Sequence, residues 1–202
     1  YFTSNLEANK LYLNKGNMEF EDITATAGVA GKGAWSTGVS LVDINHDGFL
    51  DIYVCNSGDV AETDRKNELF INNGNLTFTE AAVQYGLDDD GFSTHAVFFD
   101  YDADGDLDCF VLNNSMTNPN KIQQNATQQR MVFGTPGGDR LYRNDDNTFT
   151  DVTQQAGLFS GESGFGLGVS VADVNNDFYP DIFISNDFWE RDYLYINKKQ
   201  TR

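Results

Sequence analysis

Short apolar runs alternate with polar residues along the whole chain, and clusters of Gly, Asn and Asp separate them. Alternation with a period of two predicts half-buried β-strands, whereas a helix would repeat its apolar positions about every 3.6 residues. No segment shows a sustained helical period, although ITATAG and VTQQAG are compatible with a single helical turn. The pattern therefore predicts an all-β fold.

The same pattern recurs along the chain in two alternating kinds of segment. One kind contains an L-Y/F-x-N group followed by a short F-containing piece, and the other contains an acidic loop between two apolar runs. The copies of the first kind are NKLYLNKGNMEFEDITATAGV (9–29), NELFINNGNLTFTEAAVQYGL (67–87), DRLYRNDDNTFTDVTQQAGL (139–158) and the partial DYLYIN (192–197). Those of the second kind are TGVSLVDINHDGFLDIYVCN, THAVFFDYDADGDLDCFVLN and LGVSVADVNNDFYPDIFISN.

Each full repeat thus contains four strand-like pieces, named here strands A to D. Strand A leads into the acidic loop, strand B follows it, strand C is the L-Y/F-x-N piece and strand D is the F-T-E/D piece. Four strands per repeat predict a β-propeller of four-stranded antiparallel blades, since a β-sandwich would not repeat its own sequence so closely. A propeller needs about four to eight blades. We therefore expect a partial propeller, about half of a ring, completed by further blades or by other chains.

The repeat also predicts how the chain divides. The second repeat is longer than the first between the acidic loop and strand C, which places an insertion within residues 113–138. The repeat resumes in phase afterwards, so this Asn- and Gln-rich insertion is expected to be a surface loop. The expected parts of a single propeller segment are the end of a preceding blade (1–34), a blade (35–86), a blade with the insertion (87–157) and the start of a further blade (158–202).

The acidic loops carry the candidate chemistry. Oxygen-bearing side chains stand at loop positions 1, 3, 5 and 9, and position 7 can add its backbone carbonyl. This set suits Ca²⁺, which takes about six to eight oxygen ligands. We expect up to three calcium ions. Their predicted ligands are Asp43, Asn45, Asp47, Phe49 and Asp51 in loop 1, Asp100, Asp102, Asp104, Asp106 and Asp108 in loop 2, and Asp173, Asn175, Asp177, Tyr179 and Asp181 in loop 3.

Other interpretations of these loops fit less well. An EF-hand requires Glu at position 12 and flanking helices, but position 12 holds Val54, Val111 and Ile184, and strands flank every loop. Asp and Asn are also common in ordinary turns, yet three such loops in phase argue against chance. Within the set, loop 3 is expected to be the weakest site. Phe178 replaces the glycine of the other two loops, and a left-handed backbone is costly for Phe.

Net charge and composition narrow the possible functions. A formal charge of −18 argues against binding to nucleic acid or to anionic membranes, because both require basic patches. No apolar run is long enough to predict membrane insertion. The two cysteines, Cys55 and Cys109, should point to opposite faces of neighbouring units, which predicts buried free thiols rather than a disulfide.

The repeats resemble a known family. DVNNDFYPDIFISNDFWERDYLYIN, the N-x-L-Y/F-x-N groups and the F-x-D-x-T-x-x-A-G signals are similar to FG-GAP and VCBS-type calcium repeats, as in the integrin α-subunit propeller. They are especially similar to the ASPIC/UnbV-associated family related to cartilage acidic protein. The resemblance implies a seven-bladed propeller with calcium in the A–B loops, usually outside the cytoplasm. It implies no reaction.

These observations favour a calcium-stabilised extracellular or cell-surface scaffold for protein binding or adhesion, whose partner is a protein or the remainder of the propeller. The alternative is a carbohydrate-binding propeller or a subunit of a surface glycan-processing complex, with Trp35 and Trp189 as aromatic platforms. An enzyme of the lyase or hydrolase type is less favoured. Only His46 and His95 could act as imidazole bases, and neither has an evident catalytic partner.

Two further expectations concern the surface. The B–C and D–A connections should lie on the face opposite the acidic loops, with Trp35, Trp189, Arg191 and the insertion, so that face is the candidate partner surface. Asn-x-Ser/Thr triplets, which accept N-linked glycans in a secretory host, begin at Asn75, Asn113 and Asn125.

Overall fold

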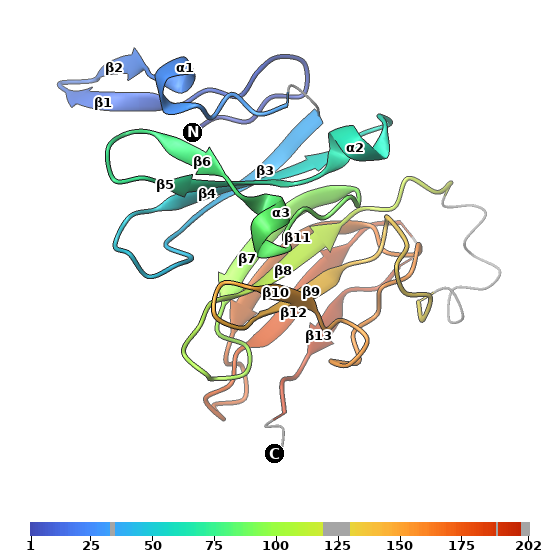
Figure 1. Cartoon of the computed structure of the whole chain (residues 1–202). Helices are drawn as coiled ribbons and strands as arrows, with labels where there is room; N and C mark the ends of the chain where they lie inside the picture. Colours follow the sequence, from blue (N-terminus) through green and yellow to red (C-terminus); the bar gives the residue numbers. More distant parts are fainter. Residues whose placement is uncertain (33–34, 119–129, 189, 199–202) are drawn as a thin grey trace.

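The computed structural model describes residues 1–32, 35–118, 130–188 and 190–198. In these residues the chain forms four antiparallel sheets, and the three larger ones stack face to face (Figure 1). The strands are β1 (Tyr12–Gly16), β2 (Glu19–Asp22), β3 (Trp35–Val42), β4 (Asp51–Ser57), β5 (Glu68–Asn72), β6 (Phe78–Glu80), β7 (Ser93–Phe99), β8 (Asp108–Asn113), β9 (Arg140–Asn144), β10 (Phe149–Asp151), β11 (Gly166–Ala172), β12 (Asp181–Asn186) and β13 (Tyr193–Tyr195). The helices are single turns: α1 (Thr24–Ala27), α2 (Glu62–Arg65) and α3 (Ala82–Tyr85).

Strands that follow one another in the sequence lie side by side in each sheet. Strands β3 to β6 form blade 1, β7 to β10 form blade 2, β11 to β13 form blade 3, and β1 and β2 form an N-terminal hairpin. The predicted all-β fold with antiparallel meander blades is therefore confirmed. The described sheets do not close into a ring. The residue limits that the sequence suggested for the blades stay a prediction.

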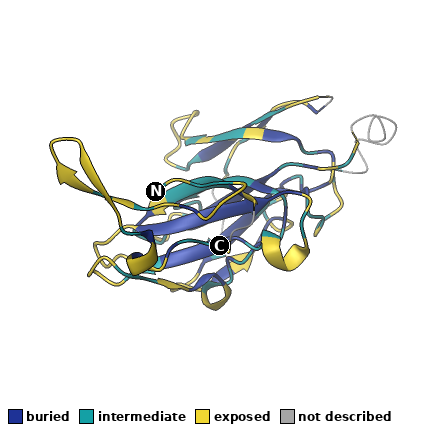
Figure 2. Ribbon diagram, turned by 90° about the horizontal axis from the view of Figure 1, so that it is seen from above, coloured by how far each residue is buried: buried dark blue, intermediate teal, exposed yellow. Residues whose placement is uncertain are grey.

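The core lies between the blades. Strand β4 is buried along its whole length, because its alternate residues face opposite neighbours. Ile52 and Val54 pack toward the N-terminal segment, whereas Tyr53 and Cys55 pack toward blade 2. Strand β8 is also buried along its whole length, and its alternate residues pack toward blade 1 and toward blade 3. Figure 2 shows buried residues running through the stack, with exposed residues in the connections and on the hairpin.

This stacking explains the cysteines. Cys55 projects from β4 toward blade 2, and Cys109 projects from β8 toward blade 1, so the two enter one hydrophobic cluster from facing sheets. Both are buried free thiols, as predicted. Burial raises the pKa of both thiols, which keeps them protonated and unreactive.

The first strands of the blades, β3, β7 and β11, lie beside one another and determine how closely neighbouring blades pack. Thr37 Oγ1 donates a hydrogen bond to the Ser93 carbonyl at 2.7 Å, and Ser40 Oγ donates to the Ala96 carbonyl at 2.5 Å. A Cβ on Gly38 would lie only 2.5 Å from the Thr94 carbonyl oxygen. Blades 1 and 2 can therefore pack this closely only because residue 38 is glycine.

A polar clamp closes the connection between strands B and C in each blade. In blade 2 the Asn113 N–H donates to Asp139 Oδ1 at 2.9 Å, and Asn113 Nδ2 donates to the Gly138 carbonyl at 2.7 Å. The clamp ties both ends of the insertion together, so extra residues can be accommodated without disturbing the blade. The equivalent backbone bonds are Asn56 N–H to Asn67 Oδ1 at 2.7 Å and Asn186 N–H to Asp192 Oδ1 at 2.9 Å.

The clamp of blade 2 predicts a pH effect on stability. Burial raises the pKa of Asp139 to about 7, and the nearby charge of Asp89 adds to this, although the Asn113 N–H opposes it. A folded-state pKa above the unfolded value of 3.8 contributes stability that is present below pH 3.8 and is lost as the pH rises to about 7. Since one pKa unit corresponds to about 1.4 kcal/mol, the loss is at most roughly 4 kcal/mol.

We expect Asp139→Asn to be more stable than the unchanged protein at pH 8 and to lose this advantage near pH 4. Blade 1 carries Asn67 at the equivalent position, so the substitution suits the clamp. Urea unfolding from pH 4 to pH 8 measures the difference. A difference between the two proteins that does not change with pH would contradict the assignment to Asp139.

Candidate metal centres

Each A–B connection folds into the same loop. In loop 2 (100–108) the position-1 carboxylate of Asp100 accepts hydrogen bonds from the backbone N–H groups of Asp104 at 3.1 Å and Gly105 at 3.0 Å. These bonds close the turn and hold the carboxylate in place. The equivalent pairs in loop 1 (43–51) are Asp47 and Gly48 to Asp43, at 3.0 and 2.9 Å, and in loop 3 (173–181) Asp177 and Phe178 to Asp173, at 3.1 and 2.9 Å.

The position-9 aspartate joins the loop to the rest of its blade. Asp108 is fully buried. Its Oδ2 accepts the Tyr101 N–H at 2.8 Å, and its Oδ1 accepts the N–H of Asn144, at the end of strand C, at 2.8 Å. Asp51 accepts from Ile44 at 3.1 Å and Asn72 at 2.7 Å, and Asp181 accepts from Val174 at 2.9 Å and Asn197 at 2.8 Å.

The sequence-based prediction missed the role of these strand-C asparagines. The last Asn of each N-x-L-Y/F-x-N group marks the repeat, but the sequence pattern by itself does not connect it with the acidic loops. In blades 1 and 2 its side chain also closes the loop, because Asn72 Nδ2 donates to the Leu50 carbonyl at 3.0 Å and Asn144 Nδ2 donates to the Leu107 carbonyl at 3.1 Å. Its fixed position in every repeat is the sequence feature that could have indicated this role.

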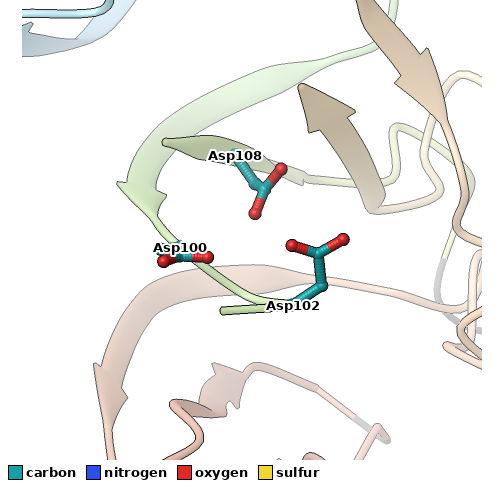
Figure 3. A group of neighbouring side chains, drawn as sticks. All are labelled: Asp100, Asp102 and Asp108. Atoms are coloured by element: carbon teal, nitrogen blue, oxygen red, sulfur yellow. The ribbon is translucent and has the colours of Figure 1, made fainter. Parts of the chain in front are cut away.

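Loop 2 brings three carboxylates together. Oxygens of Asp100, Asp102 and Asp108 all lie within 4.8 Å of one another, around one shared space (Figure 3). Asp102 Oδ1 is buried and has no hydrogen-bond partner. Burial raises the pKa of Asp108 to about 7, and burial together with the charges of Asp104 and Asp100 raises the pKa of Asp102. An all-oxygen group with one unsatisfied buried oxygen fits a hard cation, so this cluster could hold a metal ion.

The other predicted ligands take different places. Asp104 is exposed, and its Oδ1 accepts the Asp106 N–H at 3.0 Å rather than joining the cluster. In loops 1 and 3 the position-3 residue is an amide that donates to the position-5 carboxylate, Asn45 to Asp47 at 3.0 Å and Asn175 to Asp177 at 2.9 Å. Among the residues that the structure describes, a group of three carboxylates occurs in loop 2 alone.

The position-7 residues are joined to their loops by the backbone. The N–H groups of Phe49 and Tyr179 donate to the position-5 carboxylates Asp47 and Asp177 at 2.9 and 3.0 Å. The ligand expected from position 7 is a backbone carbonyl, which stays a prediction. Asp106 differs because its carboxylate also accepts the Asp146 N–H at 3.4 Å.

Phe178 adopts the left-handed backbone conformation on which the predicted weakness of loop 3 depends. Its φ is 70°, compared with 88° for Gly48 and 103° for Gly105 at the same loop position. A residue other than glycine loses about 1–2 kcal/mol in this conformation. Phe178 is 91% exposed, so packing does not offset the cost.

The remaining candidate residues do not form a second cluster in the described part of the chain. His46 lies exposed on loop 1, and His95 is half-buried on β7, where burial lowers its pKa. Trp35 lies over Gly58, whose Cβ would be 2.8 Å from the Trp35 Cβ. Trp189 and Asn125 lie outside the described residues, and Arg191 is exposed.

The candidate glycan acceptors differ in exposure. Asn113 is fully buried and its amide is engaged in the B–C clamp, so it cannot accept a glycan in the folded protein. Asn75 is exposed in the turn between β5 and β6.

None of the described helices is long and apolar enough to cross a membrane.

A family model and a curated protein match this chain. A family model described as an FG-GAP-like repeat matches residues 1–54, 59–111 and 131–200. Cartilage acidic protein 1 of Xenopus tropicalis is 26% identical over 184 residues, which cover 88% of this chain and 25% of that protein. The chain thus spans about a quarter of the length of the curated relative that it matches. Both matches agree with the resemblance that the repeats indicated.

The loop conformation predicts opposite effects of two substitutions. Phe178→Gly should stabilise the protein by about 0.5–1 kcal/mol, because the relief of left-handed strain exceeds the entropy that glycine adds to the unfolded chain. Gly105→Ala should destabilise it by a similar amount. No atom lies within 4 Å of a Cβ at Gly105, so the effect there isolates the backbone. Urea unfolding measures the stability of both variants. A Phe178→Gly protein less stable than the unchanged one would contradict backbone strain at residue 178.

Proposed function

The chain belongs to the FG-GAP-like repeat family, and we propose that it is a calcium-stabilised extracellular scaffold for protein binding. Calcium has a structural role in this proposal, and no reaction is assigned to the chain. The observation that carries the proposal is the cluster of Asp100, Asp102 and Asp108, whose oxygens lie within 4.8 Å of one another.

Charge repulsion supports calcium in loop 2. Two carboxylates about 4 Å apart repel by roughly 4 kcal/mol at an effective dielectric of about 20, and loop 2 brings three together. A bound divalent cation would offset this repulsion and supply the partner that Asp102 Oδ1 lacks. The residues that would hold it are the carboxylates of Asp100, Asp102, Asp104 and Asp108 and the carbonyl of Asp106.

The shared hydrogen bonds extend the proposal to loops 1 and 3. Both loops hold the position-1 and position-9 carboxylates as loop 2 does. Three ions would reduce the formal charge from −18 to −12. The proposed ligands are Asp43, Asn45, Asp47, Asp51 and the Phe49 carbonyl in loop 1, and Asp173, Asn175, Asp177, Asp181 and the Tyr179 carbonyl in loop 3.

An exposed face of blade 3 supports a protein partner. Phe183 pairs in register with Leu194 on β13. The equivalent pairs, Tyr53 with Leu69 and Phe110 with Leu141, are buried against the following blade. Phe183 is 42% exposed and Leu194 is 53% exposed. This face therefore has the composition of a blade-packing surface, and we propose that it receives a further blade or another protein.

The location is proposed from the chemistry of calcium. Extracellular calcium modules bind with dissociation constants of about 10⁻⁴–10⁻³ M, a range that suits a compartment rich in calcium. The acidic surface, with a formal charge of −18, suits such a scaffold and disfavours anionic partners.

We also propose the blade limits 1–34, 35–86, 87–157 and 158–202 as the units that calcium stabilises.

Removing calcium is expected to lower the unfolding temperature. At ten times its dissociation constant, an ion adds roughly 1.4 kcal/mol to stability at each site. Differential scanning calorimetry with calcium and with a chelator measures the change. An unfolding temperature that is the same in both conditions would overturn the structural role of calcium.

The effect of Asp102→Asn on stability should have opposite signs in the absence and in the presence of calcium. Without calcium it should stabilise the protein, because it removes one of three close negative charges, and with calcium it should weaken binding at loop 2 by about tenfold or more. Asp106→Asn is the matched control, since it makes the same charge change in the same loop at a position that offers only its carbonyl. Equal effects of the two substitutions on calorimetric calcium binding would contradict the ligand assignment.

A further inference from the structure

Loops 2 and 3 are connected to each other by hydrogen bonds. Asn197 ends strand C of blade 3, and its N–H donates to Asp181 of loop 3 at 2.8 Å. Its side-chain Nδ2 donates to the carbonyl of Tyr101 in loop 2 at 2.6 Å. The Tyr101 N–H in turn donates to Asp108 at 2.8 Å. An unbroken series of three hydrogen bonds therefore joins a position-9 carboxylate of one loop to that of the other.

Blades 1 and 2 use the equivalent asparagine differently. Asn72 Nδ2 donates to the Leu50 carbonyl of its own loop at 3.0 Å, and Asn144 Nδ2 donates to the Leu107 carbonyl of its own loop at 3.1 Å. Both side chains close the loop that they anchor. The Asn197 amide instead reaches across the blade boundary, 96 residues back in the sequence. The link between loops 2 and 3 is thus a particular feature of this blade pair.

We infer that calcium binding at loops 2 and 3 is positively coupled through Asn197. This inference rests on the proposed calcium sites. Fixing Asp108 in loop 2 also fixes Tyr101, because the Tyr101 N–H is bound to that carboxylate. An ordered Tyr101 carbonyl holds the Asn197 side chain, and the Asn197 N–H then holds Asp181 in place. Part of the ordering cost of the second loop is therefore met when the first loop fills.

The size of the coupling follows from the single side-chain bond that carries it. A typical hydrogen bond contributes about 0.5–1.5 kcal/mol net, which corresponds to about a two- to tenfold change in affinity. Coupling between two binding sites is reciprocal, so loop 2 should bind more tightly when loop 3 is filled, by the same factor. Loop 1 should bind independently of this pair.

The test needs the occupancy of each loop separately, and the position-6 amides provide it. The N–H groups of Gly48, Gly105 and Phe178 each donate to the position-1 aspartate of their own loop. A calcium titration followed by ¹⁵N NMR of these amides reports loops 1, 2 and 3 one by one. Asp102→Ala together with Asp104→Ala removes two of the four proposed carboxylate ligands and silences loop 2, while Asp108, Tyr101 and Asn197 are kept.

We expect this silencing to weaken calcium binding at loop 3 by about two- to tenfold. In proteins that also carry Asn197→Ala or Asn197→Leu, which keep the backbone N–H, silencing loop 2 should leave loop 3 unchanged. Asn72→Ala is the matched control, since it removes the same side chain from blade 1 and should leave the coupling of loops 2 and 3 intact.

Two results would overturn the coupling while leaving the calcium sites in place. One is a loop 3 affinity that is the same with and without loop 2 in the protein that keeps Asn197. The other is coupling that persists in both Asn197 variants. If the three amides did not respond to calcium at all, the proposed function itself would fail, which is a different outcome.

Discussion

The buried position-9 aspartate is the constraint on which each blade depends. Asp51, Asp108 and Asp181 begin strand B, and each accepts one N–H from its acidic loop and one from the end of strand C. One carboxylate thus fixes the loop and two strands at the same end of the blade. Its burial is costly for a charge, as the raised pKa of Asp108 shows. A cation bound by the same loop would offset this cost, which connects the fold to the proposed metal.

The sequence predicted the parts of the fold that repeat. Period-two alternation and the recurring segments identify strands A to D, and three acidic loops in phase identify where the carboxylates gather. The glycine missing at Phe178 predicts a left-handed residue in loop 3, and the structure places it at a φ of 70°. These features are local, because a turn and its side chains lie within a few residues of one another.

Features that depend on contacts between blades could not be predicted in the same way. The continuous apolar run of β4 does not reveal which residues face which neighbour, yet Tyr53 and Ile52 pack in different clusters. The asparagine that ends strand C has the same identity in every blade, but Asn197 bonds to the neighbouring loop whereas Asn72 bonds to its own. The same residue at the same repeat position thus forms different hydrogen bonds when the packing between blades differs. Of the three acidic loops, all within the described residues, loop 2 alone brings three carboxylates together, because its position 3 is Asp102 where the other loops carry Asn.

The proposed scaffold depends on calcium bound by the converging carboxylates of loop 2. Anomalous scattering from crystals of the protein grown with calcium tests this site. An anomalous peak is expected in the space shared by Asp100, Asp102 and Asp108, with Asp102 Oδ1 among the ligands. A clear density map of that space with no peak, at millimolar calcium, would contradict it.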